Sequence, residues 1–161
     1  MSTRALFHRA GDGDRLNVLG TNVTIKATVH DTGGAYEVVV VESGPGGDAV
    51  PHRHPWQEFY FLLDGSVEVQ IGARDHRMEA GDLVTIPPRA LHAFNVVSES
   101  ARFLHVSAGE GATAMFHDFA AQVPSVPTLE DLPAVLQIGA RHGIELALPP
   151  ELAAMAEALT S

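Results

Sequence analysis

Between about residues 22 and 108 the chain is a series of short apolar runs separated by turn residues, and no helical period appears in this stretch. Residues 23–29 alternate in polarity, residues 36–42 are rich in β-branched side chains, and Asp64-Gly65 is typical of a hairpin turn. Short runs at such regular spacing are typical of antiparallel strands. The pattern alone therefore predicts an all-β sandwich or barrel. The other predicted strands cover residues 58–63, 66–71, 74–79, 83–87, 92–97 and 102–107.

The pattern changes after Gly111, where helical segments replace strands. We predict a short helix over residues 114–121, a second that begins with Asp131 as N-cap, and a third that begins at Pro150. Thr128 would cap the second helix equally well, but Pro133 would then lie deeper inside it, where proline costs more. The second and third of these helices cannot bury their apolar faces against each other alone. We therefore expect a barrel domain over residues 1–111 and a helical extension over residues 112–161 that packs on the barrel or on a partner subunit.

Composition excludes several classes of function. The net charge is −10, so a polyphosphate would be repelled and nucleic acid is not expected as a partner. The absence of cysteine excludes disulfides, thiolate metal sites and a cysteine nucleophile. No stretch approaches the roughly 20 apolar residues of a membrane span, and charged residues interrupt residues 1–20, which therefore lack a signal-peptide core. A cytoplasmic protein with no membrane partner is expected.

A cluster of potential metal ligands occurs in the first half of the chain. His52 and His54 are two residues apart, so on a strand their side chains lie on one face. Glu58 follows at another even step, and His92 lies in a later strand. Three imidazoles and one carboxylate suit one divalent transition ion per chain, with Fe, Ni, Mn, Co, Zn and Cu about equally compatible. A histidine pair of this spacing is also common on surfaces, and a single histidine such as His92 is more often hydrogen bonded in a core or turn.

These residues stand in two motifs that resemble those of the cupin superfamily. The first family motif, G(X)5HXH(X)3,4E(X)6G, is matched at every position by Gly46, His52, His54, Glu58 and Gly65. The second, G(X)5PXG(X)2H(X)3N, is matched by Gly81, Pro87 and His92. Two departures occur, because Arg89 replaces the second glycine and Asn95 precedes the asparagine position by one residue. The departures affect the turn and the strand rather than the four ligand positions.

The resemblance implies a double-stranded β-helix, or jelly roll, with a motif core over residues 35–108 and the ion inside the mouth of the barrel. Within the superfamily the chain is most similar to the small quercetin dioxygenase-like proteins, which implies a metal-dependent dioxygenase of flavonol-like or related enolisable molecules. His52, His54, Glu58 and His92 would then be the ligands, and Glu58 would also be the catalytic base. A metal-dependent isomerase or cyclase, and a non-catalytic small-ligand-binding protein, are the alternatives.

Further expectations concern the substrate pocket and the partners. Aromatic side chains near the motifs are candidates for an apolar pocket, although the barrel core is the commoner place for such residues, and His105 is a candidate contact to ligand or substrate. The partners expected are a small-molecule substrate, O2 and a second copy of the chain, since β-branched runs such as residues 38–41 suit pairing of sheets and cupins commonly form homodimers. The pocket candidates are Trp56, Phe61, Phe94, Phe103 and His105.

Overall fold

The computed structural model describes residues 5–47 and 49–160 of the 161-residue chain. Three helices follow the strands: α1 (Ala112–Gln122), α2 (Leu132–Arg141) and α3 (Pro150–Thr160). None of the helices in the described part of the chain is long and apolar enough to span a membrane. The strands are β1 (Asp14–Val18), β2 (Thr21–Ala27), β3 (Tyr36–Ser43), β4 (Ala49–Arg53), β5 (Glu58–Asp64), β6 (Ser66–Ile71), β7 (Arg74–Glu79), β8 (Leu83–Ile86), β9 (His92–Val96), β10 (Ala101–Ala108) and β11 (Glu145–Leu146).

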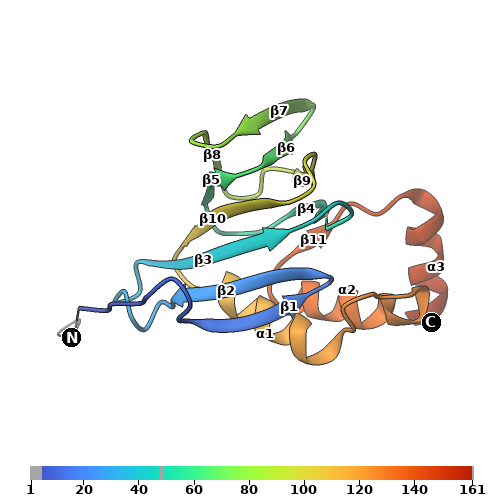
Figure 1. Ribbon diagram of the computed structural model, residues 1–161. Coiled ribbons are helices and arrows are strands. Elements are labelled where there is room, and N and C mark those ends of the chain that lie inside the picture. The colour runs from blue at the N-terminus through green and yellow to red at the C-terminus, as the bar shows by residue number, and fades with distance from the viewer. Residues whose placement is uncertain (1–4, 48, 161) are drawn as a thin grey trace.

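The strands form two antiparallel sheets that face each other as a jelly roll (Figure 1). Among the described residues, one sheet has six strands in the order β1-β2-β3-β10-β5-β8, and the other has five in the order β11-β4-β9-β6-β7. The predicted all-β fold with a C-terminal helical extension is confirmed. The division of the chain at residue 111 into a barrel and an extension stays a prediction.

The Asp64-Gly65 turn was predicted as a hairpin, and this prediction is wrong. Strand β5 pairs with β8 and β10, whereas β6 pairs with β7 and β9, so the turn carries the chain from one sheet to the other. Gly65 has φ of 81°, and a Cβ placed there would lie 2.2 Å from the backbone oxygen of Ser100. Only glycine permits this corner.

The period of two along each strand builds an apolar core that becomes polar toward one end of the barrel. On β10 the inward residues are Phe103, then His105, then Ser107, and each is at most 5% exposed. On β5 the inward residues change in the same way, from Leu62 through Tyr60 to Glu58. Because β5 and β10 pair in register, their polar residues lie side by side. The sheets therefore place the candidate site at one end of a core of aliphatic and aromatic side chains.

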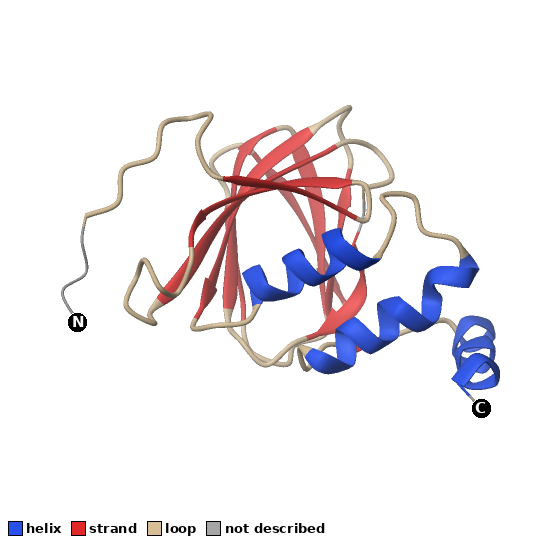
Figure 2. Cartoon of the chain, turned by 90° about the horizontal axis from the view of Figure 1, so that it is seen from below, coloured by secondary structure: helices blue, strands red, loops and turns tan. Residues whose placement is uncertain are grey.

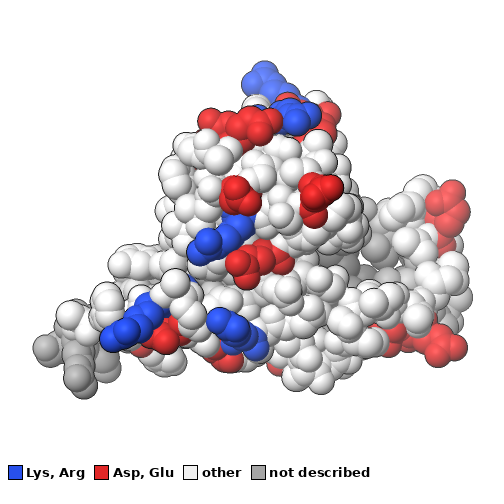
Figure 3. Space-filling model, viewed as in Figure 1, with Lys and Arg blue, Asp and Glu red and all other residues white. Residues whose placement is uncertain are grey.

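Apart from buried residues such as Glu37 and Glu58, charged side chains lie on the outside of the barrel. On the face shown in Figure 3, lysine and arginine side chains alternate with acidic ones and form no continuous basic patch. Arg102 pairs with Glu42 at 3.5 Å, and Arg77 pairs with Glu79 at 2.9 Å. Exposed pairs of this kind contribute little to stability.

Helices α1 and α2 lie across one side of the barrel (Figure 2). Helix α1 contacts β1 and β3, and Phe119 of α1 and Ile138 of α2 reach the main core. After α2 the chain forms β11, which pairs with β4. Neither β1 nor β11 was predicted from the sequence, since both are short and carry little alternation.

The second helix begins with both of the predicted capping residues in use. The backbone N–H and hydroxyl of Thr128 donate to the carboxylate of Asp131, and the Thr128 hydroxyl accepts from the N–H of Glu130. This capping box starts a 3₁₀ turn at Leu129–Asp131, which continues into α2 with Asp131 at the N-cap position. Pro133 then falls in the first turn of α2, where proline is tolerated.

A buried carboxylate holds the beginning of α1. Glu37 on β3 is 1% exposed, and it accepts hydrogen bonds from the Thr113 N–H at 2.9 Å, from the Thr113 hydroxyl and from the Ser107 hydroxyl at 3.4 Å. The N-cap residue Gly111 provides no side-chain cap. Glu37 therefore caps α1 from a neighbouring strand, and its negative charge lies at the positive end of the helix dipole.

Replacing Thr113 with valine keeps the shape of the side chain and removes one donor to Glu37. We expect the free energy of unfolding to fall by about 1–3 kcal/mol, because a buried carboxylate then loses a hydrogen bond. Urea unfolding followed by circular dichroism measures the change. Thr113→Ser should retain most of the stability, and Thr85→Val on the exposed side of β8 should change it by less than about 0.5 kcal/mol. An unaltered urea midpoint in Thr113→Val would show that α1 is held without this hydroxyl.

Candidate metal centre

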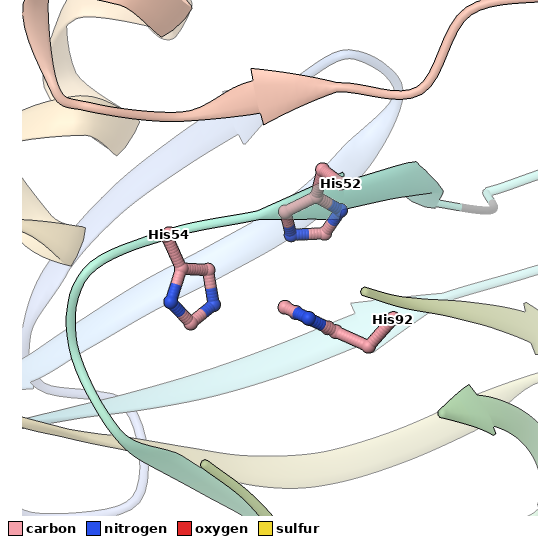
Figure 4. Close-up of side chains that lie close together, drawn as sticks. All are labelled: His52, His54 and His92. Atoms are coloured by element: carbon pink, nitrogen blue, oxygen red, sulfur yellow. The ribbon is translucent and has the colours of Figure 1, made fainter. Parts of the chain in front are cut away.

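Three histidines from two neighbouring strands converge at the polar end of the barrel (Figure 4). His52 lies on β4 and His92 begins β9, and the two residues are register partners. Their ring centroids are 4.2 Å apart, and the ring of His54 is 4.7 Å from that of His92. One ring nitrogen of each residue lies within 4.8 Å of the others. His54 follows the last residue of β4, and its ring faces the other two.

Each of these rings is held by a hydrogen bond from its Nδ1 atom to a backbone carbonyl. His52 bonds to Val50 at 2.7 Å, His54 to Trp56 at 3.0 Å and His92 to Ala90 at 2.9 Å. A carbonyl oxygen only accepts, so Nδ1 carries the proton, and in the neutral ring Nε2 presents a lone pair. The Nε2 atoms of His54 and His92 are buried and have no hydrogen-bond donor. This is the arrangement of metal-binding imidazoles, in which a carbonyl fixes the orientation of the ring.

Glu58 completes the cluster from the first position of β5. One carboxylate oxygen lies 3.2 Å from Nε2 of His54, the other lies 3.0 Å from Nε2 of His92, and the side chain is 3% exposed. Burial alone would raise the pKa of Glu58, but the charge and hydrogen bond of His105 lower it well below its usual value. An ionised carboxylate therefore faces two lone pairs. A divalent transition ion between them is the partner that this set of acceptors fits.

Two further side chains hold the carboxylate of Glu58. The Tyr60 hydroxyl donates to one oxygen at 2.7 Å, and Nε2 of His105 bonds to the other at 2.6 Å. Burial, and then the charge of Glu58, raise the pKa of Tyr60 well above 10, so the phenol keeps its proton and acts as a donor. His105 was predicted as a candidate contact, whereas Tyr60 was missed. The period of two would have revealed it, because Tyr60 lies two residues after Glu58 on the same face of β5.

His52 is the most accessible of the three histidines, with intermediate exposure. Burial, and then the neighbouring His92, lower the pKa of His52 from 6.5 to about 4. At neutral pH the imidazole is therefore uncharged, which is the form that binds a metal ion.

The structure places the aromatic residues predicted for the pocket in different surroundings, and the pocket itself stays a prediction. Trp56 lies at the site, where its ring stacks on His54 with centroids 4.3 Å apart and planes inclined by 8°. Phe94 and Phe103 lie beside Tyr60, at 6.2 and 5.1 Å, in the main core. Phe61 alternates with Glu58 and Tyr60 along β5 and so lies on the opposite face, which removes it from the predicted pocket.

The departure from the second motif at Arg89 preserves the local geometry. Arg89 has φ of 61°, so it adopts the left-handed conformation that a glycine would adopt at lower cost. Its backbone N–H donates to the carbonyl of His54 at 2.8 Å, which ties this turn to a candidate ligand. Its side chain pairs with Glu145 on β11 at 3.2 Å, a contact that glycine could not make.

An antiparallel jelly roll with three imidazoles and a carboxylate at one end of its core defines the class of this protein as a β-barrel with a candidate metal centre. Residues 39–107, which include both motifs, match the sequence profile of the cupin domain, and this match supports the resemblance to the cupin superfamily.

Curated relatives match part of the chain. A dimethylsulfoniopropionate lyase of Ruegeria pomeroyi, DddW, is 37% identical over 82 residues, which cover 51% of this chain and 54% of the relative. A quercetin 2,3-dioxygenase of Bacillus subtilis is 32% identical over 99 residues, which cover 60% of this chain and 29% of the relative. The match thus spans about half or less of these relatives.

Solved structures support the fold. KdgF from Halomonas sp. superposes with a TM-score of 0.61 and 18% identity, over 70% of this chain and 99% of that one. The polyketide cyclase RemF from Streptomyces resistomycificus superposes with a TM-score of 0.56 and 24% identity, over 68% of this chain and 81% of that one. At these identities the likeness shows the jelly roll alone.

Trp56 is the only tryptophan of the chain, and its stacking on His54 makes it a reporter of metal binding. We expect Ni²⁺, Co²⁺ or Cu²⁺ to quench its fluorescence and to saturate near one equivalent per chain. The double variant His52→Ala with His92→Ala keeps the stacked pair and should abolish the quenching. His76→Ala, at an exposed position of β7, is the matched control and should titrate like the wild type. A wild-type protein that binds none of the six candidate metals, by fluorescence or elemental analysis, would contradict a metal centre.

The metal-free protein should lose stability in acid because of His52. Its pKa is 6.5 in the unfolded chain and about 4 in the fold, so the stabilisation is complete above pH 6.5 and is lost as the pH falls toward 4. A shift of this size corresponds to a loss of about 3 kcal/mol. Urea unfolding of chelator-treated protein at pH 7.5 and pH 4.5 measures it. His52→Asn should show a smaller loss and His76→Asn the full one, and equal losses in all three proteins would contradict the assignment.

Proposed function

We propose that this chain is a metal-dependent dioxygenase of a small enolisable substrate, of the flavonol type or a related one. The observation that supports this most directly is that the Nε2 atoms of His54 and His92 converge on the carboxylate of Glu58. The similarity to a quercetin 2,3-dioxygenase over 60% of the chain agrees with it.

In this proposal His52, His54, His92 and Glu58 hold one ion of Fe, Ni, Mn, Co, Zn or Cu. When bound, the ion would supply Lewis acidity that stabilises the negative charge of a deprotonated substrate oxygen. The Nδ1–H bonds of the histidines to backbone carbonyls keep the three lone pairs aimed at one point, so the ligand set needs little reorganisation.

Glu58 is proposed to accept the enol proton of the substrate. The carboxylate is already ionised, as a base must be, and Tyr60 and His105 hold its two oxygens in place. The same two donors stabilise the anion and therefore make it a weak base. A weak base suits an acidic O–H group, such as that of an enol, better than it suits a C–H group.

A lyase reaction is the second candidate, and the similarity to the dimethylsulfoniopropionate lyase over 51% of the chain favours it. The substrate named for that relative carries a carboxylate, which the same metal centre could bind. An elimination from such a substrate starts at a C–H group, for which Glu58 is less well suited.

Glu58→Gln keeps an amide oxygen near the ion but cannot accept a proton. With full metal occupancy, we expect the rate of oxygen uptake to fall about 10²- to 10⁴-fold. An oxygen electrode with a panel of flavonols and β-diketones measures the rate. Glu68→Gln, at an exposed position of β6, is the matched control and should react like the wild type.

Each result of this experiment distinguishes the candidates. A wild-type rate in the fully loaded Glu58→Gln variant would show that Glu58 is not the base. If the wild type loaded with each candidate metal takes up no oxygen with any member of the panel, the dioxygenase proposal is wrong. Consumption of dimethylsulfoniopropionate, followed by proton NMR, would then support a lyase, and isomerisation or cyclisation of a panel member would support the remaining enzymatic alternative. Binding of a panel member without reaction would support a ligand-binding protein.

A further inference from the structure

A small apolar cluster, here named the cap, lies over the candidate metal centre. Trp56, Ala112 and Ile144 are buried in it, and three partly buried side chains pack against them. Trp56 belongs to the loop after β4, whereas the other members belong to α1 or to the segment around β11. The cap therefore comes almost entirely from residues beyond 107, where the match to the cupin domain ends. The partly buried members are Met115, Phe116 and Leu146.

Members of the cap contact or adjoin residues of the centre. Trp56 stacks on His54, and Phe116 lies edge-on to His105 with ring centroids 5.7 Å apart. Leu146 on β11 is the register partner of His52. The cap therefore adjoins two candidate ligands and the histidine that holds Glu58.

The position of Phe116 is fixed by contacts at the beginning of α1. Thr113, one turn earlier, is held by the buried carboxylate of Glu37. Gly111 has φ of 146°, and a Cβ placed there would lie 2.8 Å from two ring carbons of Trp56, so the backbone of this residue packs directly on the indole. Helix α1 is thus attached to β3 on one side and to Trp56 on the other, which leaves Phe116 little freedom to move away from His105.

The cap encloses the centre tightly. Glu58, His54 and His92 are 3%, 2% and 1% exposed. Two polar atoms among these rings, Nε1 of Trp56 and Nδ1 of His105, are buried without a hydrogen-bond partner. Such atoms are costly unless a ligand or water satisfies them. A bound molecule that reached the ligand set would therefore meet an apolar wall with polar atoms beside it.

We propose that the cap restricts this site to compact enols of one ring or a short chain, and that Phe116 is the residue that sets the limit. The inference rests on the proposed function and narrows its substrate class from flavonols and related enols to the compact related enols, which disfavours the flavonols themselves. A compact enol places its oxygens toward His52, His54 and His92 and leaves only a small apolar part against the cap. A second fused ring or a phenyl substituent needs the volume that the Phe116 ring occupies beside His105.

Maltol and 3-hydroxyflavone form a matched pair of ligands for the test, because they share a 3-hydroxy-4-pyranone head and differ in the size of the rest. Zinc-loaded protein in oxygen-free buffer allows their dissociation constants to be measured by calorimetry without turnover. The larger ligand buries more apolar surface and would bind more tightly if space allowed. We expect the wild type to bind maltol at least about tenfold more tightly, and Phe116→Ala to shift the ratio of the two constants at least about tenfold toward 3-hydroxyflavone.

Controls separate the selection of substrate from folding. Phe7→Ala, at a position that is 82% exposed, is the matched substitution and should leave the ratio unchanged. Phe116→Leu, which keeps an apolar side chain in α1, should shift the ratio in the same direction by a smaller factor and provides the test if Phe116→Ala does not fold. A merely structural loss would weaken both ligands equally and leave the ratio constant.

The possible failures are distinguishable. If the wild type binds both ligands but prefers 3-hydroxyflavone, or if both Phe116 variants keep the wild-type ratio, the inference about the cap is wrong and the proposed function stands. If zinc-loaded wild type binds neither ligand, both the enol substrate class and the inference are overturned.

Discussion

Buried acceptors that face each other at 3.0 and 3.2 Å repel unless a cation lies between them, and this constraint governs the polar end of the barrel. The pairs concerned are Nε2 of His54 and of His92 with the two oxygens of Glu58. An uncompensated buried carboxylate is strongly destabilising. The hydrogen bonds of Tyr60 and His105 offset part of this cost, and a metal ion would offset the remainder. The arrangement of these side chains is thus explained by the ion that the site would hold.

The polar site and the apolar core depend on the same strands. At one end of the barrel, strands β3, β5 and β10 each carry an inward polar residue. These residues are Glu37, Glu58 and Ser107, and Ser107 is the register partner of both glutamates. Deeper in the barrel the same strands carry aliphatic and aromatic residues that form the core. Stability and function are therefore separated along the length of each strand, and the rigid core holds the site in position. Glu37 extends this role to the helical extension, because it holds α1 at the same end of the barrel.

The sequence was most informative where one local rule decides the structure. Short apolar runs between turn residues predicted eight of the strands, and the motif spacing predicted the convergence of His52, His54 and His92. Local rules do not determine which strands pair, so the Asp64-Gly65 corner was mistaken for a hairpin. Strand β11 exists only because β4 offers it an edge, and its two residues have no pattern of their own. The period of two along β5 could have predicted that Tyr60 lies beside Glu58. The position of Phe116 could not be predicted in this way, because it depends on how α1 packs over the barrel.

The boundary between the segment that matches the cupin domain and the cap bears directly on what can be inferred from relatives. The residues that match the cupin domain end at 107, and they include the four candidate ligands and both donors to Glu58. The cap side chains that adjoin His52 and His105 are Leu146 and Phe116, which lie beyond the matched segment. A shared set of metal ligands makes proton transfer and Lewis acidity available to many reactions. The choice of substrate depends instead on the side chains that contact the substrate. Similarity within the barrel thus supports the proposed class of chemistry, and the proposed selection of substrate depends on the cap of this chain. Arg89 also links these two parts of the chain, since this residue at a motif position of the barrel pairs with Glu145 of the extension.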